Sequence, residues 1–173
     1  MIPLAIPNIS GNEGQYLQDC VTSTFVSTVG PFVSQFESMV AQHSGTPGAV
    51  ATSAGTTGLH AGLVALGVGR DDLVIAPSLT FIASCNAISH AGATPWLMDV
   101  DEDSWCLDPA LVHQALERDT DRQAGQVVHR ATGRRVAAIM PVFTMGTPAD
   151  MDPLLAIATD AGLPVICDAA AAL

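Results

Sequence analysis

Hydrophobic and polar positions alternate from residue 49 onward in a pattern typical of strands that are each followed by a helix. The expected strands are short apolar runs, the first beginning at Ala49 and the others covering residues 73–76, 94–100, 136–142 and 164–167. The expected helices carry apolar side chains at helical spacing and cover residues 59–66, 81–90, 111–118 and 154–161. Strands joined by helices of about ten residues form right-handed β–α–β units, so the pattern predicts an α/β fold with a mainly parallel sheet and flanking helices.

The stretch from Ala49 to Leu66 combines an expected strand, a loop of small residues and a helix start. The loop reads Ser53-Ala54-Gly55-Thr56-Thr57-Gly58. The N-terminus of a helix exposes unpaired backbone N–H groups and the positive end of the peptide dipoles, so it can hold a phosphate without lysine or arginine. Glycine-rich turns between a strand and a helix also serve only to turn the chain, and both interpretations stay open at this point.

The chain divides into two expected domains. Residues 1–48 form an N-terminal arm with short helices at 16–21 and 32–40, and residues 49–173 form a partial α/β domain. In the second domain, Asp108-Pro109 and Asp152-Pro153 predict helix starts, because aspartate caps a helix and proline suits its first turn. Residues 119–135 are polar and predict an exposed excursion. The chain stops directly after an expected buried strand, which would need neighbours to cover it, so we expect a longer, truncated fold.

Composition excludes several classes of function. The 173 residues carry a formal net charge of −11, with six arginines and no lysine, which argues against a nucleic-acid surface. No run approaches the ~18 apolar residues of a membrane span, and the N-terminus lacks a secretory pattern, so we expect a soluble cytoplasmic protein. The cysteines and histidines lack the spacing of metal ligands, and the acidic run 99–103 lacks the glycine and glutamate of a calcium loop. We therefore expect no metal.

Two residues at expected strand ends suit a cofactor that is both aromatic and phosphorylated. In open parallel sheets ligands bind beyond the carboxyl ends of the strands, where Phe81 offers a ring face and Asp168 a carboxylate. Pyridoxal phosphate (PLP) needs a phosphate cradle, a stacking ring and a carboxylate, because its protonated pyridine ring is the electron sink of the reaction. For Asp168 alone, a capping or structural role stays open.

Two other kinds of site fit the loop at 53–58 less well. A serine-hydrolase elbow would need a glycine where Ala51 stands. A dinucleotide-binding loop would need three glycines at fixed spacing, whereas this loop has two at another interval. Neither a hydrolase nor a nicotinamide enzyme is therefore indicated.

Many short motifs follow one another along the chain in the same order as in the sequences of one known family. They are Ile2-Pro3-Leu4, Gly11-Asn12-Glu13, Phe25-Val26-Ser27-Thr28-Val29-Gly30, Phe32-Val33 with Phe36-Glu37, Ser53 to His60, Pro77-Ser78-Leu79-Thr80-Phe81-Ile82-Ala83, Asp99-Val100-Asp101, Pro148 to Asp152, and Asp168-Ala169-Ala170. Over essentially the whole chain, this series resembles the N-terminal half of the PLP-dependent nucleotide-sugar aminotransferases of the DegT/StrS family.

The resemblance implies a fold, a cofactor and a reaction. The fold would be the large domain of an aspartate-aminotransferase-like (type I) PLP transferase, working as a homodimer. The backbone around Gly55, Thr56 and Thr57 would hold the PLP phosphate, Phe81 would stack on the ring, and Asp168 would pair with the ring nitrogen. The reaction would move an amino group from glutamate to a nucleotide-linked keto sugar for surface polysaccharide or amino-sugar synthesis. The segment 132–135 is similar to that of members acting on 4-keto-6-deoxy sugars.

Three departures from the family pattern limit what the chain could do alone. Ala171 stands where the family has a glutamine or histidine that bonds the cofactor's ring oxygen. Phe143 replaces the histidine of the family's Pro-Val-His turn, and Thr144-Met145 replaces the bulky pair that follows it. The family's Schiff-base lysine lies beyond Leu173, and without an amine no transamination can occur. We expect an inactive N-terminal portion; the alternatives are a degenerate fragment that binds a partner subunit, or part of a PLP-dependent sugar dehydratase.

Overall fold

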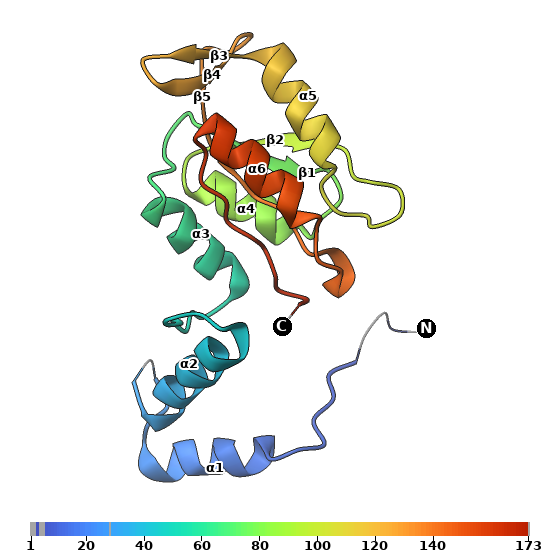
Figure 1. Cartoon of the computed structure of the whole chain (residues 1–173). Helices are drawn as coiled ribbons and strands as arrows, with labels where there is room; N and C mark the ends of the chain where they lie inside the picture. Colours follow the sequence, from blue (N-terminus) through green and yellow to red (C-terminus); the bar gives the residue numbers. More distant parts are fainter. Residues whose placement is uncertain (1–2, 4–5, 28, 173) are drawn as a thin grey trace. The chain divides into compact units, whose positions relative to one another are not determined.

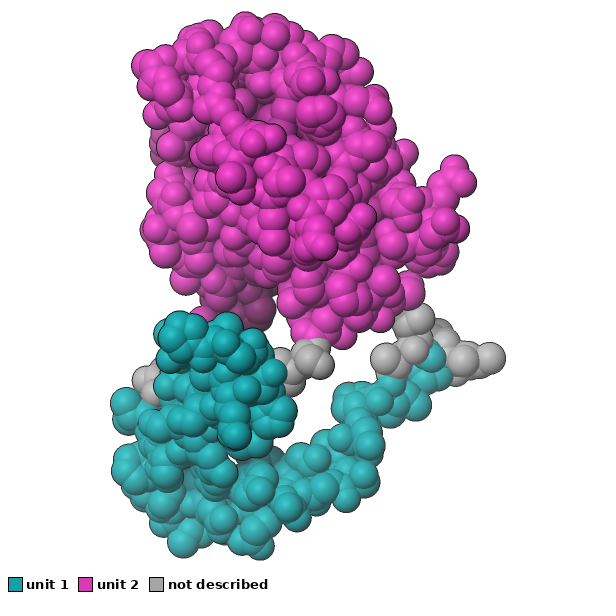
Figure 2. Space-filling model, viewed as in Figure 1, with its two compact units in different colours: residues 1–51 teal, residues 52–173 magenta. Residues whose placement is uncertain are grey.

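A computed structural model describes residues 3, 6–27 and 29–172 of the chain (Figure 1). It divides into two compact units, residues 1–51 and residues 52–173, which are coloured separately in Figure 2. None of the described helices has the length and hydropathy needed to cross a membrane. Three residues of the family motifs, Ile2, Leu4 and Thr28, lie outside the described residues.

The first unit contains two helices, α1 (Glu13–Ser23) and α2 (Pro31–Ser44). Both predicted helices are confirmed, and each extends beyond its predicted range. Proline occupies the first turn of α2, and Gly45 ends it in the left-handed conformation at φ 64°. The Tyr16 and Phe32 rings join the two helices, with centroids 5.2 Å apart.

The expected strand beginning at Ala49 is wrong. Residues 49–52 pair with none of the described strands, and Val50 is 83% exposed. The Ala51 N–H instead donates to Glu37 Oε1 at 2.8 Å. Apolar composition alone does not make a strand, because the backbone groups of a strand need a neighbour to pair with.

The second unit is built on a sheet with the strand order β2-β1-β5-β4-β3. Its strands are β1 (Leu73–Pro77), β2 (Thr94–Met98), β3 (Thr120–Gln123), β4 (Gln126–His129) and β5 (Arg135–Ile139). β1 runs parallel to β2 and β5, whereas β4 pairs antiparallel with both β5 and β3. The α/β class is confirmed, but the sheet is mixed, because the antiparallel hairpin extends the parallel part.

That hairpin corrects the prediction of an exposed excursion at 119–135. Val127 and Val128 of β4 are buried, and residues 124–125 turn the chain with positive φ at both positions. Two residues with φ > 0 match the twist of a tight hairpin, which allows β3 and β4 to pair. The exposed part of the hairpin is β3, whose four residues are all polar and largely exposed.

Helices cover both faces of the sheet. They are α3 (Gly55–Ala65), α4 (Ile82–His90), α5 (Pro109–Asp119) and α6 (Met151–Ala161). β1 alternates between two cores: Leu73 and Ile75 pack with residues of α5 and α6, while Val74 and Ala76 pack with residues of α3 and α4. Because it is buried on both faces, β1 reads as a continuous apolar run.

The helix starts agree with the sequence in one case and differ in the other. Asp108 caps α5, with its side chain accepting from the Ala110 N–H, as predicted. α6 begins at Met151 with Asp150 at its N-cap, so Asp152 is not the cap. The expected last strand at 164–167 is reduced to isolated parallel bridges, Ile139 with Val165 and Val142 with Asp168.

Two arginines form hydrogen bonds with residues at the amino ends of the parallel strands. Arg135 forms a bidentate pair with the buried Asp72 (Nε–Oδ1 2.9 Å, Nη2–Oδ2 2.5 Å) and donates to the Gly67 carbonyl. Arg134 donates to the Asp71 and Asp72 carbonyls and to the Thr94 hydroxyl. Burial raises the pKa of Asp72, but hydrogen bonds from Arg135 and the Gly69 N–H, with the arginine charges, outweigh burial and leave the pKa below its ordinary value. We call residues 72, 134 and 135 the arginine clasp.

Candidate functional site

A cavity of about 640 Å³ lies at the carboxyl end of the parallel strands. Its walls come from the start of α3, the loop between β1 and α4, the turn after β5 and the segment that ends at Ala171. Gly55, Thr56, Phe81 and Asp168 all line it, so four of the five predicted site residues lie together. They come from three separate segments of the chain, the first and last of which are more than 100 residues apart.

Asp168 is held by neutral donors. Its Oδ2 accepts a hydrogen bond from the Ser84 hydroxyl at 2.6 Å, and its Oδ1 accepts a longer one from the Ala170 N–H at 3.3 Å. The side chain is buried, with 7% of the residue exposed, and no cation pairs with it among the described residues. Buried carboxylates are ordinarily paired with a positive charge, so the wall of this cavity lacks a counter-ion that a ligand can supply.

Phe81 is the N-cap residue of α4 and is 79% exposed, although it lines the cavity. Its extended backbone (φ −68°, ψ 141°) turns the chain out of β1 and into the helix. An aromatic ring left exposed at the mouth of a cavity offers a face on which a planar ligand can stack.

The start of α3 provides backbone donors on another wall. Gly55 and Thr56 are the first two helical residues, whose N–H groups have no partner within an α-helix. Thr57 does not line the cavity with them. Its hydroxyl donates to the Ala54 carbonyl at 2.7 Å and accepts from the Ala54 N–H at 3.2 Å, so its side chain closes the helix cap.

Two further residues of the site were missed at the sequence level. Ser84 contacts Asp168 and is fully buried, and the only signal for it was a small polar residue in the first turn of an expected helix. Thr144 lines the cavity, and its buried hydroxyl has no hydrogen-bond partner among the described residues. A buried hydroxyl without a partner is destabilising unless a ligand or water satisfies it. Phe143 and Ala171 line the same cavity.

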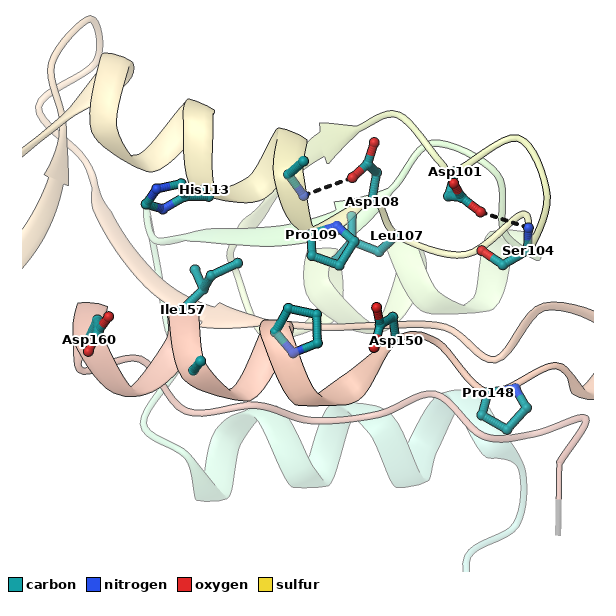
Figure 3. A pocket seen from close by; sticks show the side chains of 13 residues that line it. Asp101, Ser104, Leu107, Asp108, Pro109, His113, Pro148, Asp150, Ile157 and Asp160 are labelled. Atoms are coloured by element: carbon teal, nitrogen blue, oxygen red, sulfur yellow. Dashed lines mark hydrogen bonds between the residues drawn. The ribbon is translucent and has the colours of Figure 1, made fainter.

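Another hollow of about 750 Å³ lies between α5 and α6, and Figure 3 shows its lining side chains. Two of its carboxylates accept hydrogen bonds from the local backbone: Asp108 from the Ala110 N–H and Asp101 from the Ser104 N–H, both at 2.8 Å. Within the described residues, no three histidine, cysteine or acidic side chains are grouped so as to hold a metal ion. Asp150 and Asp160 also line the hollow, but both are exposed to solvent. Among the described residues, the hollow therefore has no buried carboxylate without a cation, in contrast to the first cavity.

Burial raises the pKa of two thiols, Cys85 and Cys167, which are the chain neighbours of Ser84 and Asp168. A raised thiol pKa keeps cysteine protonated at neutral pH and therefore a poor nucleophile. The chemistry that the first cavity supports is accordingly ligand binding by a carboxylate, a ring and a helix N-terminus.

Comparisons with known proteins agree on one family. The model of the DegT/DnrJ/EryC1/StrS aminotransferase family matches residues 7–173. GDP-perosamine synthase from Caulobacter vibrioides is 41% identical over 172 residues, which are 99% of this chain and 42% of that protein. The chain thus spans less than half the length of this curated relative.

Solved structures of similar fold cover nearly the whole chain. An aminotransferase from Psychrobacter cryohalolentis is 30% identical with a TM-score of 0.82, over 99% of this chain and 40% of that one. A putative sugar aminotransferase from Streptococcus pneumoniae, solved in its PLP form, is 27% identical with a TM-score of 0.79, over 99% of this chain and 43% of that one.

Proposed function

Since this chain belongs to the DegT/DnrJ/EryC1/StrS aminotransferase family, we propose that its second unit forms the PLP-binding wall of a nucleotide-sugar aminotransferase. The predicted family and α/β class are confirmed by the matches, and PLP is the cofactor that the family and the PLP-form neighbour imply. The site assignments remain predictions.

The observation that carries the proposal is the buried Asp168 carboxylate, with which no cation pairs in the described part of the chain. A protonated ring nitrogen would supply the missing positive charge and a hydrogen-bond donor at the same place. Phe81 would support one face of that ring, and the N–H groups of Gly55 and Thr56 would hold the phosphate. The Thr144 hydroxyl, which has no partner among the residues that the structure describes, is another group that a polar ligand would satisfy. The residues present therefore fit the cofactor.

The chemistry that bound PLP supplies is an electron sink for the carbanion formed at the substrate carbon. This chain's own part is to bind and orient the ring and to keep its nitrogen protonated. The chain contains no lysine, so the amine that the reaction requires has to come from outside residues 1–173. We therefore propose that these residues alone do not transaminate.

The substrate and assembly form the wider proposal. We propose a GDP-linked keto sugar as amino acceptor and glutamate as donor, in a cytoplasmic homodimer; the 41% identity to a GDP-perosamine synthase supports the sugar class. A chimera of residues 1–173 with the remaining part of the Caulobacter relative should aminate a GDP-linked 4-keto-6-deoxy sugar in a glutamate-dependent way. Activity with other nucleotide sugars but not with this one would contradict the proposed substrate.

Cofactor binding is tested with pyridoxamine phosphate (PMP), which needs no lysine. We expect the 173-residue chain to bind PMP in calorimetric titration, and Asp168→Asn to weaken binding about a hundredfold, because a charged hydrogen bond and an ion pair are lost.

The matched control is Asp160→Asn, the same chemical change at an exposed residue that lines the hollow of Figure 3. It should leave PMP affinity unchanged. Equal affinity of the Asp168→Asn and parent chains would refute the assignment of Asp168, and no PMP binding by the parent chain would refute the proposed function of these residues.

A further inference from the structure

The buried contact between Ser84 and Asp168 joins two parts of the site. Ser84 is the third residue of α4 and is 0% exposed, and Asp168 lies 84 residues later, beside the end of β5. Their Oγ–Oδ2 distance is 2.6 Å, which lies within the range of about 2.5–2.7 Å that is typical of a hydroxyl donating to an ionised carboxylate. Ser84 also lies 2.8 Å from the Thr80 hydroxyl.

The chemistry of the acceptor sets the direction of these hydrogen bonds. An ionised carboxylate can only accept, so the single Ser84 proton is committed to Asp168. The Thr80 hydroxyl must then donate to Ser84 Oγ, in preference to its longer 3.3 Å contact with the Phe81 carbonyl. Thr80 thus donates to Ser84 and Ser84 to Asp168, and each bond polarises the next.

The same helix turn carries the stacking ring. Phe81 caps α4, and the Ser84 N–H donates to the Phe81 carbonyl at 3.2 Å. The hydrogen bond from Ser84 to Asp168 therefore fixes the carboxylate relative to the turn that presents the Phe81 ring. Among the described residues, the Asp168 carboxylate has one other hydrogen-bond partner, the Ala170 N–H at 3.3 Å, which by itself is a weak restraint.

We propose that Ser84 is a positioning residue, which orients the Asp168 carboxylate toward the ring nitrogen of the cofactor. The inference rests on the proposed function for its ligand, but its geometric part concerns this chain alone. A serine that merely filled space would leave the carboxylate orientation and the protonation of a bound ring unchanged when replaced by alanine. If Ser84 positions Asp168, its replacement by alanine should change both the orientation of the carboxylate and the protonation of the bound ring.

The first readout needs no ligand. In a crystal structure of the Ser84→Ala chain, we expect the Asp168 carboxylate to leave its present orientation or to occupy two. Ser84→Thr, which keeps the hydroxyl, should retain the single orientation. Ser89→Ala makes the same change at an exposed position in the last turn of α4 and should alter nothing at the site.

The second readout uses PMP labelled with ¹⁵N in the ring. We expect Ser84→Ala to weaken PMP binding about tenfold and to move the ring ¹⁵N signal toward that of the neutral pyridine, with recovery in Ser84→Thr. If the alanine variant does not fold, Ser84→Cys serves instead, because its thiol fills the space but is a weak donor and should show the same losses.

An unchanged Asp168 orientation in Ser84→Ala, or an unchanged ring signal and affinity, would overturn the role of Ser84. If the parent chain binds no PMP, the proposed function fails. The carboxylate orientation in Ser84→Ala still decides in that case whether Ser84 positions Asp168.

Discussion

The two ends of the parallel strands differ in whether their buried polar groups have partners within the described protein. At the amino ends, the arginine clasp pairs a buried carboxylate with a guanidinium and satisfies three backbone carbonyls. At the carboxyl ends, Asp168 is buried without a described cation and the Thr144 hydroxyl has no described partner. The first arrangement stabilises the fold by itself, whereas the second leaves groups for a ligand. The presence or absence of a described cation therefore distinguishes Asp72, a structural carboxylate, from Asp168, a carboxylate proposed to bind a ligand.

The largest expected effect comes from breaking the clasp. Arg135→Met would leave Asp72 buried without its bidentate partner, so we expect a loss of about 3 kcal/mol in the free energy of unfolding, measured in urea. Arg118→Met removes an exposed ion pair with Asp119 and should have little effect. Similar stability of the two variants would show that the clasp is not structural.

The pH dependence of stability is a second test of whether the ion pair of the arginine clasp stabilises the fold. The folded-state pKa of Asp72 lies below its ordinary value of 3.8, so the clasp contributes fully above that value. The contribution is lost as the pH falls through the folded pKa, because protonation removes the pair. We expect the stability gap between the parent chain and Arg135→Met to be constant near neutral pH and to narrow below about pH 4. A gap that widens with acid would contradict this.

A smaller effect is expected at the turn that carries Thr144. Gly146 has φ +86°, and a Cβ there would lie 2.9 Å from the Ala171 carbonyl oxygen. Gly146→Ala should cost about 2–3 kcal/mol, from backbone strain and from the displaced Ala171 segment. Gly133→Ala has a similar φ of +68° with open space around it and should cost about 1 kcal/mol. Thermal unfolding of the two variants separates backbone strain from the close contact with Ala171. Equal losses of stability in Gly146→Ala and Gly133→Ala would show that the close contact does not contribute.

The smallest effect should distinguish binding from stability most cleanly. Thr144→Val removes a buried hydroxyl without a described partner, so unfolding free energy should change by less than about 1 kcal/mol, while PMP affinity falls about fivefold. Thr147→Val makes the same change at an exposed residue outside the cavity and should leave both unchanged. A destabilised Thr144→Val chain with normal PMP affinity would assign Thr144 to the fold.

Local patterns predicted the elements whose contacts are local. The helix capped by Asp108, the helix that begins at Pro31 and the apolar strand β1 follow from residues within a few positions of each other. The hairpin at β3 and β4 was missed because its polar residues indicate a loop, while its pairing depends on β5. The strand expected at Ala49 failed for the opposite reason, since its apolar residues have no described strand beside them.

The candidate site divides in the same way. Phe81 and Asp168 were predicted from their places after expected strands, and the cavity brings them together with Gly55 and Thr56. Ser84 and Thr144 could not be predicted, because their importance depends on partners, or on the absence of described partners, that only folding reveals.

By itself, the sequence determined the α/β class, the family resemblance and the absence of a lysine, because these depend on residue identity and spacing along the chain. Tertiary structure decided which polar groups are satisfied. Arg135 reaches Asp72 across 63 residues and neutralises it, whereas Ser84 reaches Asp168 across 84 residues and only orients it. Burial makes that distinction energetic, since an unpaired charge costs most where water is excluded.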